Sequence, residues 1–349
     1  MKYRPLGKTG LKVSEIGMGT WQLANDPNCW VGADLKESLK SLYKFVELGG
    51  NFIDTAWIYG YSDDKPDVHP SENLIGKFLK ESRLRDKLVI ASKVPGKNMK
   101  WPAWKGISIS EVFPNEWIEK CVDDSLKSLG VGTIDLMQFH VWQDDFVKED
   151  GWKKMVEKIT KSGKVRYWGI SANDYQPSNC IKTLNTGLIS TVQLIFNIFH
   201  QLPIKRLFPY AKEHNIGLIA RVPLDEGSLT GKFTLDTKFN EGELRYSFFA
   251  GERLKEVVKR ADTLKNLLGE EAKILTELAL RFILSFPEIS TTIPGLRRLK
   301  HVEENVSVSD GRVLSKEMLE KLEKHTWERN FNSESSRDPS LKKSGFIEK

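Results

Sequence analysis

Apolar and polar positions along the chain alternate between two periods. Short runs rich in β-branched residues, typical of strands, are each followed by a longer segment in which apolar residues recur at helical spacing. In residues 34–50, five apolar side chains form one stripe: Leu35, Leu39, Leu42, Phe45 and Val46. The pair Gly49-Gly50 ends that predicted helix. Residues 114–130 repeat the pattern, with Pro114 near the start and Gly130 at the end.

The strand-like runs number eight: 14–20, 51–56, 88–94, 134–141, 165–171, 191–197, 216–223 and 290–295. Eight strand–helix alternations predict an α/β fold, a closed (β/α)8 TIM barrel, as a single domain over residues 1–349. An open, doubly wound sheet is the alternative. Before the first run, residues 2–16 predict a short N-terminal β-hairpin that turns at Lys8–Gly10 and can cover the barrel floor.

Three segments are longer than plain connections: 95–116, 232–252 and 329–349. Loops that follow barrel strands lie on the catalytic face, so these segments are candidates for shaping a substrate pocket. The first two contain eight aromatic residues: Trp101, Trp104, Phe113, Phe233, Phe239, Tyr246, Phe248 and Phe249. Such side chains either line an apolar pocket or pack the loops onto the barrel, and packing is the expectation for any single one.

Composition excludes several classes of protein. The net charge of +6 comes from 53 basic and 47 acidic residues spread along the chain, which does not predict a nucleic-acid interface. No apolar run approaches the roughly 20 residues of a membrane span, and the N-terminus lacks a signal-peptide core. Three separated cysteines without CxxC or HExxH motifs predict neither disulfides nor a metal site. We therefore expect a cytoplasmic protein.

Two glycine-containing segments lack positions that phosphate-binding motifs need. GKTG at 7–10 has Lys2 where a P-loop needs its upstream glycine, and GMGTWQ at 17–22 has Gln22 where a Rossmann motif needs its third glycine. Neither nucleotide site is predicted.

Ionisable residues stand at the ends of three consecutive predicted strands. Asp54 ends the second strand, with Tyr59 five residues beyond it, Lys93 ends the third, and His140 ends the fourth. Barrel interiors prefer branched aliphatic residues, because unpaired ionisable groups are costly to bury. Each residue alone has an ordinary structural explanation, but together they predict a catalytic site at one mouth of the barrel.

This set of groups is suited to moving a proton at an oxygen. A phenol has an ordinary pKa of about 10, and the nearby ammonium of Lys93 is expected to lower the pKa of Tyr59. Asp54 can hold Lys93 charged, and His140 can hydrogen-bond a substrate oxygen. No nucleophile is evident, so the set predicts carbonyl reduction with hydride from a cofactor. An isomerase or aldolase would need a neutral Lys93 to form a Schiff base, which Asp54 opposes.

The chain resembles the aldo-keto reductase family. Motifs in the right order span nearly its whole length: PLGKTGLKVSEIGMGTW, NFIDTAWIYG, IASKV, DLMQFHVW, WGIS, VQLIFN, PLDEGSLTGK and IPGLRRLKHVEEN. The resemblance implies an eight-stranded barrel that binds NADPH, less often NADH, and reduces a small-molecule carbonyl substrate. It assigns Tyr59 as proton donor, with Asp54, Lys93 and His140 completing a tetrad. A regulatory or scaffold subunit with the same barrel and negligible turnover is the alternative function.

The resemblance also implies a cofactor site. Asp54 and the loop of Gly19, Thr20 and Trp21 would approach the nicotinamide, and Ser171 with Gln193 would hold its carboxamide. The loop over the pyrophosphate would comprise Pro223, Leu224, Gly227, Leu229, Gly231 and Lys232. The adenosine end would comprise Gly295, Arg297, Glu304 and Asn305. Arg297 suits a 2′-phosphate, which favours NADPH, although a solvated arginine at a helix start would look the same.

Three positions depart from the family pattern. Ala172 follows the serine of GIS where many members have asparagine, so Asn173 is the candidate substitute at the carboxamide. Arg221 stands where many members place a tyrosine that stacks on the nicotinamide; a guanidinium can stack too, but its charge would disfavour the oxidised ring. His301 replaces the usual glutamine or arginine beside the adenosine phosphate. The pattern does not decide between a monomer and an oligomer.

Overall fold

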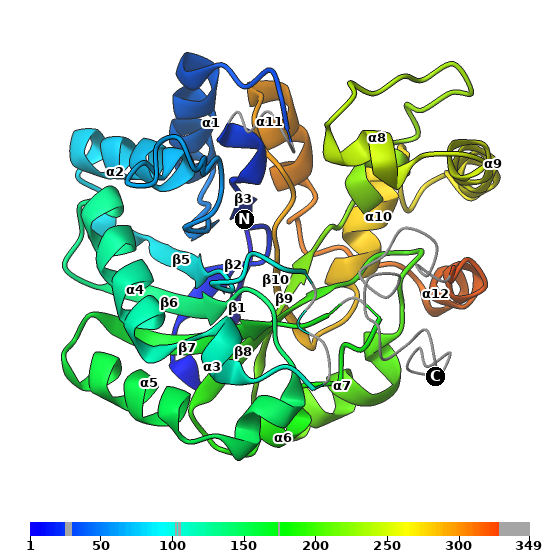
Figure 1. Cartoon of the computed structure of the whole chain (residues 1–349). Helices are drawn as coiled ribbons and strands as arrows, with labels where there is room; N and C mark the ends of the chain where they lie inside the picture. Colours follow the sequence, from blue (N-terminus) through cyan, green and yellow to red (C-terminus); the bar gives the residue numbers. More distant parts are fainter. Residues whose placement is uncertain (25–29, 102, 104–105, 174, 328–349) are drawn as a thin grey trace.

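The computed structural model describes residues 1–24, 30–101, 103, 106–173 and 175–327. Eight parallel strands lie side by side in chain order, surrounded by helices (Figure 1). They are β3 (Met18–Gly19), β4 (Phe52–Asp54), β5 (Val89–Val94), β6 (Ile134–Phe139), β7 (Val165–Ser171), β8 (Ile189–Ile195), β9 (Gly217–Arg221) and β10 (Ile289–Thr292). Parallel bridges from Ile16 to Thr292 and from Gly19 to Gly295 join the two outer strands. The predicted barrel is confirmed, and the open sheet is wrong.

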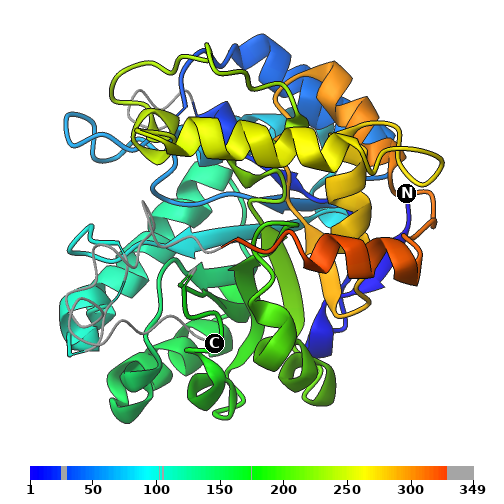
Figure 2. The same ribbon diagram turned by 90° about the vertical axis from the view of Figure 1, so that its right-hand side faces the viewer.

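The helices lie outside the strands, as Figures 1 and 2 show from two directions. They are α1 (Leu35–Glu47), α2 (Pro70–Ser82), α3 (Ile109–Val112), α4 (Asn115–Leu129), α5 (Gly151–Lys161), α6 (Ile181–Leu184), α7 (Pro203–Glu213), α8 (Leu244–Phe248), α9 (Arg253–Lys265), α10 (Leu275–Leu284), α11 (Leu299–Ser307) and α12 (Lys316–Glu323). Among the described residues, no helix combines the length and the apolarity that a membrane crossing requires.

The first two predicted helices form where their sequence signals place them. The Asp34 side chain caps α1 by accepting hydrogen bonds from two backbone amides, and Gly130 ends α4 in the left-handed conformation, with φ of 64°. Leu42 and Phe45 are fully buried, as the apolar stripe requires. Leu35 is 62% exposed, so its place in the stripe was wrong. Leu35 is the first residue of α1, and this end of the helix extends beyond the part of the barrel against which Leu42 and Phe45 pack.

The N-terminal hairpin covers the floor of the barrel, as predicted. Its strands β1 (Tyr3–Pro5) and β2 (Lys12–Ser14) pair antiparallel. Leu6 and Val13 are fully buried and pack with Phe52 and Val89, the first residues of β4 and β5. Burying these side chains closes the barrel at the end opposite the predicted site.

Most aromatic residues of the long loops pack the loops onto the protein. Phe113 is buried against Phe139, with ring centroids 4.9 Å apart. Phe249 contacts both Phe233 and Phe239 at 5.1 and 5.3 Å. These contacts agree with the packing interpretation. Trp104 and the segment 329–349 lie outside the described residues.

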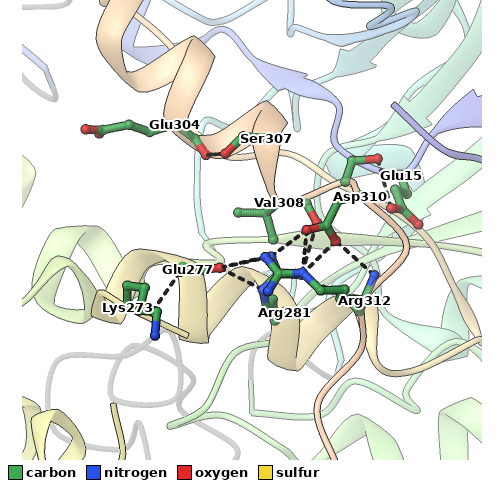
Figure 3. Close-up of polar contacts among 10 residues, drawn as sticks. Glu15, Lys273, Glu277, Arg281, Glu304, Ser307, Val308, Asp310 and Arg312 are labelled. Atoms are coloured by element: carbon green, nitrogen blue, oxygen red, sulfur yellow. Dashed lines mark hydrogen bonds and ion pairs between the residues drawn. The ribbon is translucent and has the colours of Figure 1, made fainter. Parts of the chain in front are cut away.

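A buried arginine fastens the chain after α11 to α10. Figure 3 shows the Arg281 side chain between Glu277 and Asp310. Its Nη1 and Nη2 donate to the two Asp310 carboxylate oxygens, both at 2.9 Å, and its Nε donates to Glu277 at 2.9 Å. The Arg281 hydrogen bond also holds the pKa of the Asp310 carboxyl well below its usual range. Arg312 contacts the same carboxylate at 2.7 Å, but its side chain is 61% exposed.

A buried carboxyl group lies between α2 and β5. Glu72 of α2 is fully buried, and one of its carboxylate oxygens accepts a hydrogen bond from the Ser92 hydroxyl at 2.5 Å. The other oxygen has no hydrogen-bond partner within the described residues. Burial raises the pKa of Glu72 to about 7, so the folded protein holds a proton that the unfolded chain releases near its ordinary pKa.

We predict different costs for removing the two arginines that contact Asp310. Arg281→Met should lower the free energy of unfolding by about 2 kcal/mol, because it removes the buried cation whose charge-assisted hydrogen bonds join Glu277 to Asp310. Arg312→Met removes an exposed ion pair and should cost less than about 1 kcal/mol. Urea unfolding of both variants checks this, and equal losses would show that burial does not distinguish the two pairs.

We also predict that Glu72 makes stability depend on pH. Its stabilising contribution is fully present below about pH 4.5, declines as the pH rises, and is lost above its folded pKa of about 7. The total decline amounts to about 3 kcal/mol. Glu72→Gln should remove it, whereas Glu252→Gln, at a side chain 89% exposed, should not. Urea unfolding at pH 5 and pH 8 measures the change; a decline that persists in Glu72→Gln would refute the assignment.

Candidate active site

The four predicted catalytic residues meet at the carboxyl ends of neighbouring strands. Asp54 is the last residue of β4, Lys93 lies near the end of β5, and His140 directly follows β6. Asp54 pairs with Ala91 in the register of β4 and β5, so the Lys93 side chain rises beside the end of β4. Parallel strands thus bring residues 86 positions apart along the chain to one mouth.

The Lys93 ammonium joins the acid to the phenol. It forms an ion pair with the Asp54 carboxylate, donates to the Thr55 carbonyl at 2.7 Å, and donates to the Tyr59 hydroxyl at 3.1 Å. An ammonium has three protons, so these contacts use all of them. Lys93 is fully buried, and the orientation of its ammonium is therefore fixed by its partners.

Lys93 and Tyr59 both have a raised pKa in the buried mouth. Burial acts against the charged form of Lys93 and is the largest single effect, but Asp54 and Tyr59 together outweigh it, so the pKa of Lys93 is raised. Desolvation raises the pKa of Tyr59, while Lys93 and Arg221 act in the lowering direction. The expected lowering by Lys93 is therefore present but is exceeded by desolvation, and the net direction predicted from sequence was wrong. At neutral pH the phenol carries the proton it would donate.

His140 faces Tyr59 as a neutral ring. Their ring centroids are 5.8 Å apart at 72°. Burial, Lys93 and Arg221 together place the pKa of His140 well below its usual range. Its Nδ1 has no hydrogen-bond partner among the described residues. A neutral imidazole can hydrogen-bond a substrate oxygen without adding charge to the site.

A glutamine that the sequence analysis missed completes the surroundings of Asp54. The second Asp54 oxygen accepts from Gln138 Nε2 at 3.1 Å and from Gln193 Nε2 at 2.8 Å. Gln138 lies on β6, two positions before His140, and pairs with Lys93 in register. The sequence did contain a signal for Gln138. Side chains two positions apart on a strand share one face, so the residue two before His140 is expected to face the same site. Gln193 donates its amide to Asp54, which leaves its Oε1 as the acceptor for a carboxamide.

The first-strand loop supports the site and forms one wall. The Thr20 hydroxyl donates to the Asp54 carbonyl at 2.9 Å, so it braces the end of β4. A side chain at Gly19 would approach the Ile293 carbonyl to 2.7 Å, which explains the glycine. Trp21 stacks on Tyr59, with centroids 5.8 Å apart and planes at 19°. This loop therefore positions the phenol as well as shaping the mouth.

Two further tryptophans extend this aromatic wall. Trp30, which the sequence analysis did not single out, meets Trp21 edge-on at 6.2 Å. Trp101 meets the His140 ring edge-on at 5.0 Å. Trp101 is thus the loop aromatic that fits the pocket-lining interpretation. Trp21 and Trp101 thus lie on the aromatic residues Tyr59 and His140, with Trp30 behind Trp21.

Of the residues predicted around the nicotinamide, Ser171 and Asn173 lie at the end of β7, Gln193 lies on β8, and Arg221, predicted to stack on the ring, ends β9. Ser171 ends β7 and is 3% exposed. Asn173 donates its amide to the Ala103 carbonyl at 3.1 Å, and Arg221 donates Nη2 to the Ala172 carbonyl at 3.2 Å. Asn173 Oδ1 and Arg221 Nε are buried without a hydrogen-bond partner in the part of the chain that the structure describes. Such atoms fit a ring with a polar substituent.

The predicted pyrophosphate loop is held in unusual backbone conformations. Val222, Asp225 and Glu226 have φ of 54°, 45° and 54°, and Gly227 and Gly231 are also positive. Non-glycine residues in this region are strained, and such strain clusters at ligand sites. Asn197 braces the turn by donating to the Val222 carbonyl at 2.8 Å.

Side chains of this loop differ in how they face solvent. Pro223 and Leu229 are buried, so they can offer a ligand only backbone groups, whereas Leu224 is half-buried and Lys232 is exposed.

The residues predicted at the adenosine end also gather. Arg297 is half-buried, and its Nη1 donates to the Val31 carbonyl at 2.9 Å, which is not the environment of a solvated helix start. His301 interacts electrostatically with Lys232, Arg297 and Glu304. Burial is the main cause that lowers the pKa of His301 below its ordinary value.

Gly295 and Asn305 have packing roles at this end. A side chain at Gly295 would collide with Gln22, and Asn305 is 3% exposed. A parallel bridge joins Gly19 to Gly295, so the first-strand loop beside Tyr59 lies next to the segment that leads to Arg297.

Residues 15–326 match the Aldo/keto reductase family. The chain belongs to that family. This aldo/keto reductase is 29% identical over 306 residues to the aldo-keto reductase YhdN of Bacillus subtilis (strain 168), covering 87% of each chain. It is 26% identical over 341 residues to the NADH-specific methylglyoxal reductase of Escherichia coli (strain K12), covering 93% of this chain and 100% of that protein.

A solved structure supports the same assignment. The glycerol dehydrogenase AKR11B4 from Gluconobacter oxydans has a TM-score of 0.73 and 27% identity to this aldo/keto reductase, over 93% of this chain and 94% of that one. The protein is therefore an NAD(P)H-dependent oxidoreductase of carbonyl compounds.

Proposed function

We propose that this reductase converts aldehydes or ketones to alcohols with NADPH, and that Tyr59 donates the proton. The observation that carries the proposal is the position of one ammonium. Lys93 Nζ contacts the Asp54 carboxylate and lies 3.1 Å from the Tyr59 hydroxyl, in a buried mouth. This arrangement holds a protonated phenol beside a fixed cation, which stabilises the phenolate left when the proton departs.

The residues around Tyr59 divide the chemistry between them. When bound, the nicotinamide supplies a hydride to the carbonyl carbon. The Tyr59 hydroxyl and the neutral His140 ring bind the carbonyl oxygen, and the Tyr59 proton passes to that oxygen as negative charge develops there. The carbon gains a hydride and the oxygen a proton, which together make the alcohol. Lys93 keeps its own protons throughout, which also argues against a Schiff-base mechanism.

The described residues fit a nicotinamide dinucleotide. Ser171, the free Oδ1 of Asn173 and the Oε1 of Gln193 would hold the carboxamide at the ends of β7 and β8. The strained turn after β9 would follow the pyrophosphate with its backbone amides. Arg297 would bind the 2′-phosphate of NADPH, since a guanidinium can donate two hydrogen bonds to it.

The mouth favours small, flat carbonyl substrates. Trp21 stacks on Tyr59 and Trp101 meets the neighbouring His140 ring, and aromatic faces stack well on planar apolar groups. The glycerol dehydrogenase and methylglyoxal reductase among its relatives are named for small polar compounds, so short substrates belong in the search as well.

We predict that Tyr59→Phe abolishes reduction but preserves cofactor binding. Loss of the proton donor should slow turnover by about 10²- to 10⁴-fold, because general acid catalysis typically contributes that much. NADPH consumption with a reactive aromatic aldehyde measures turnover, and fluorescence titration measures affinity. Near-normal turnover in the variant would refute the role of Tyr59. Tight NADPH binding by the wild type without turnover on a broad aldehyde panel would favour a regulatory or scaffold subunit.

Arg297→Ala should weaken NADPH binding by about 10- to 100-fold and leave NADH within about twofold, because only NADPH carries the 2′-phosphate. Arg298→Ala is the matched control, since Arg298 is adjacent and exposed. Dissociation constants for both cofactors check the prediction. Equal losses for NADPH and NADH would dismiss the 2′-phosphate role of Arg297.

A further inference from the structure

We propose that Arg221 makes the active site select the reduced cofactor over the oxidised one. This inference rests on the proposed function, because it needs a nicotinamide in the mouth. It goes beyond that function because it states which reaction direction the site favours. The fixed charge of Arg221 would favour carbonyl reduction and the release of NADP⁺.

The position of Arg221 places its charge beside the proposed carboxamide site. Arg221 is the last residue of β9 and pairs with Ile195 of β8. Its Nη2 donates to the Ala172 carbonyl at 3.2 Å. Ala172 lies between Ser171 and Asn173, so a nicotinamide held by those residues would lie against the guanidinium.

No carboxylate in the described part of the chain forms an ion pair with Arg221. Its Nε is buried without a hydrogen-bond partner among the same residues. Asp54, the carboxylate of the mouth, is already paired with Lys93. The charge of Arg221 nevertheless reaches the centre of the site, because it acts to lower the pKa of both Tyr59 and His140. Among the described side chains of the mouth, the positive charge of Arg221 is therefore not cancelled by a carboxylate.

This charge acts differently on the two forms of the cofactor. The oxidised nicotinamide ring is positively charged and the reduced ring is neutral. Repulsion between two cations in contact, in a partly desolvated site, is strong enough to change affinity about tenfold. The reduced ring has no such penalty, and a guanidinium plane can stack on it. Hydride transfer creates the repelled form, so the same charge would speed its release.

The test compares dissociation constants for NADPH and NADP⁺, measured by quenching of tryptophan fluorescence. Trp21 lies in the mouth beside Tyr59 and is a suitable reporter. The variants are Arg221→Met, which removes the charge at similar length, and Arg221→Lys, which keeps it. Arg221→Gln is a second neutral variant that retains a donor for the Ala172 carbonyl, in case the methionine disturbs the strand end.

In the wild type we expect NADPH to bind more tightly than NADP⁺. The dissociation constant for NADP⁺ divided by that for NADPH should fall about tenfold in the Met and Gln variants. In the Lys variant this ratio should stay within about twofold of the wild-type value. An unchanged ratio in both neutral variants, with both cofactors still bound, would overturn the inference and leave the proposed function intact. Failure of the wild type to bind either form would overturn both.

Discussion

The ion pair between Asp54 and Lys93 is the interaction on which the site depends. Burying two charges is costly, and the cost is offset only when every donor and acceptor is used. Here the ammonium contacts Asp54, Thr55 and Tyr59, and the second Asp54 oxygen accepts from Gln138 and Gln193. The pair therefore has one geometry. That geometry places a cation against the phenol of Tyr59 and turns an ordinary tyrosine into a proton donor with a stabilised conjugate base.

The residues that stabilise the barrel lie apart from the residues of the catalytic mouth. Below the site, the hairpin buries Leu6 and Val13 against the first residues of the strands. Around it, buried charges such as Arg281 fasten outer segments to the helices. The mouth retains a strained turn after β9, and the buried atoms His140 Nδ1, Asn173 Oδ1 and Arg221 Nε have no hydrogen-bond partner among the described residues. A ligand that binds there can satisfy these atoms.

Much of this architecture could be predicted from the sequence, and the failures have physical causes. The eight strands and the positions of Asp54, Lys93 and His140 follow from local periodicity, which the fold preserves. Leu35 was misplaced because periodicity does not say where a helix leaves the surface it covers. Gln138 and Trp30 were missed because their roles come from neighbours distant in sequence. The net shift of Tyr59 depends on desolvation, which only the assembled mouth determines.

The most direct test of the account is the pH dependence of NADPH-driven aldehyde reduction in the wild type and in Lys93→Met. The account predicts that the wild-type rate is constant near neutral pH and falls at alkaline pH, where Tyr59 loses its proton. Lys93→Met should be at least about 10²-fold slower. Its alkaline limb should move to higher pH, because the cation that favours the phenolate is gone. A variant that keeps the wild-type rate and the wild-type limb would contradict the central role of this ion pair.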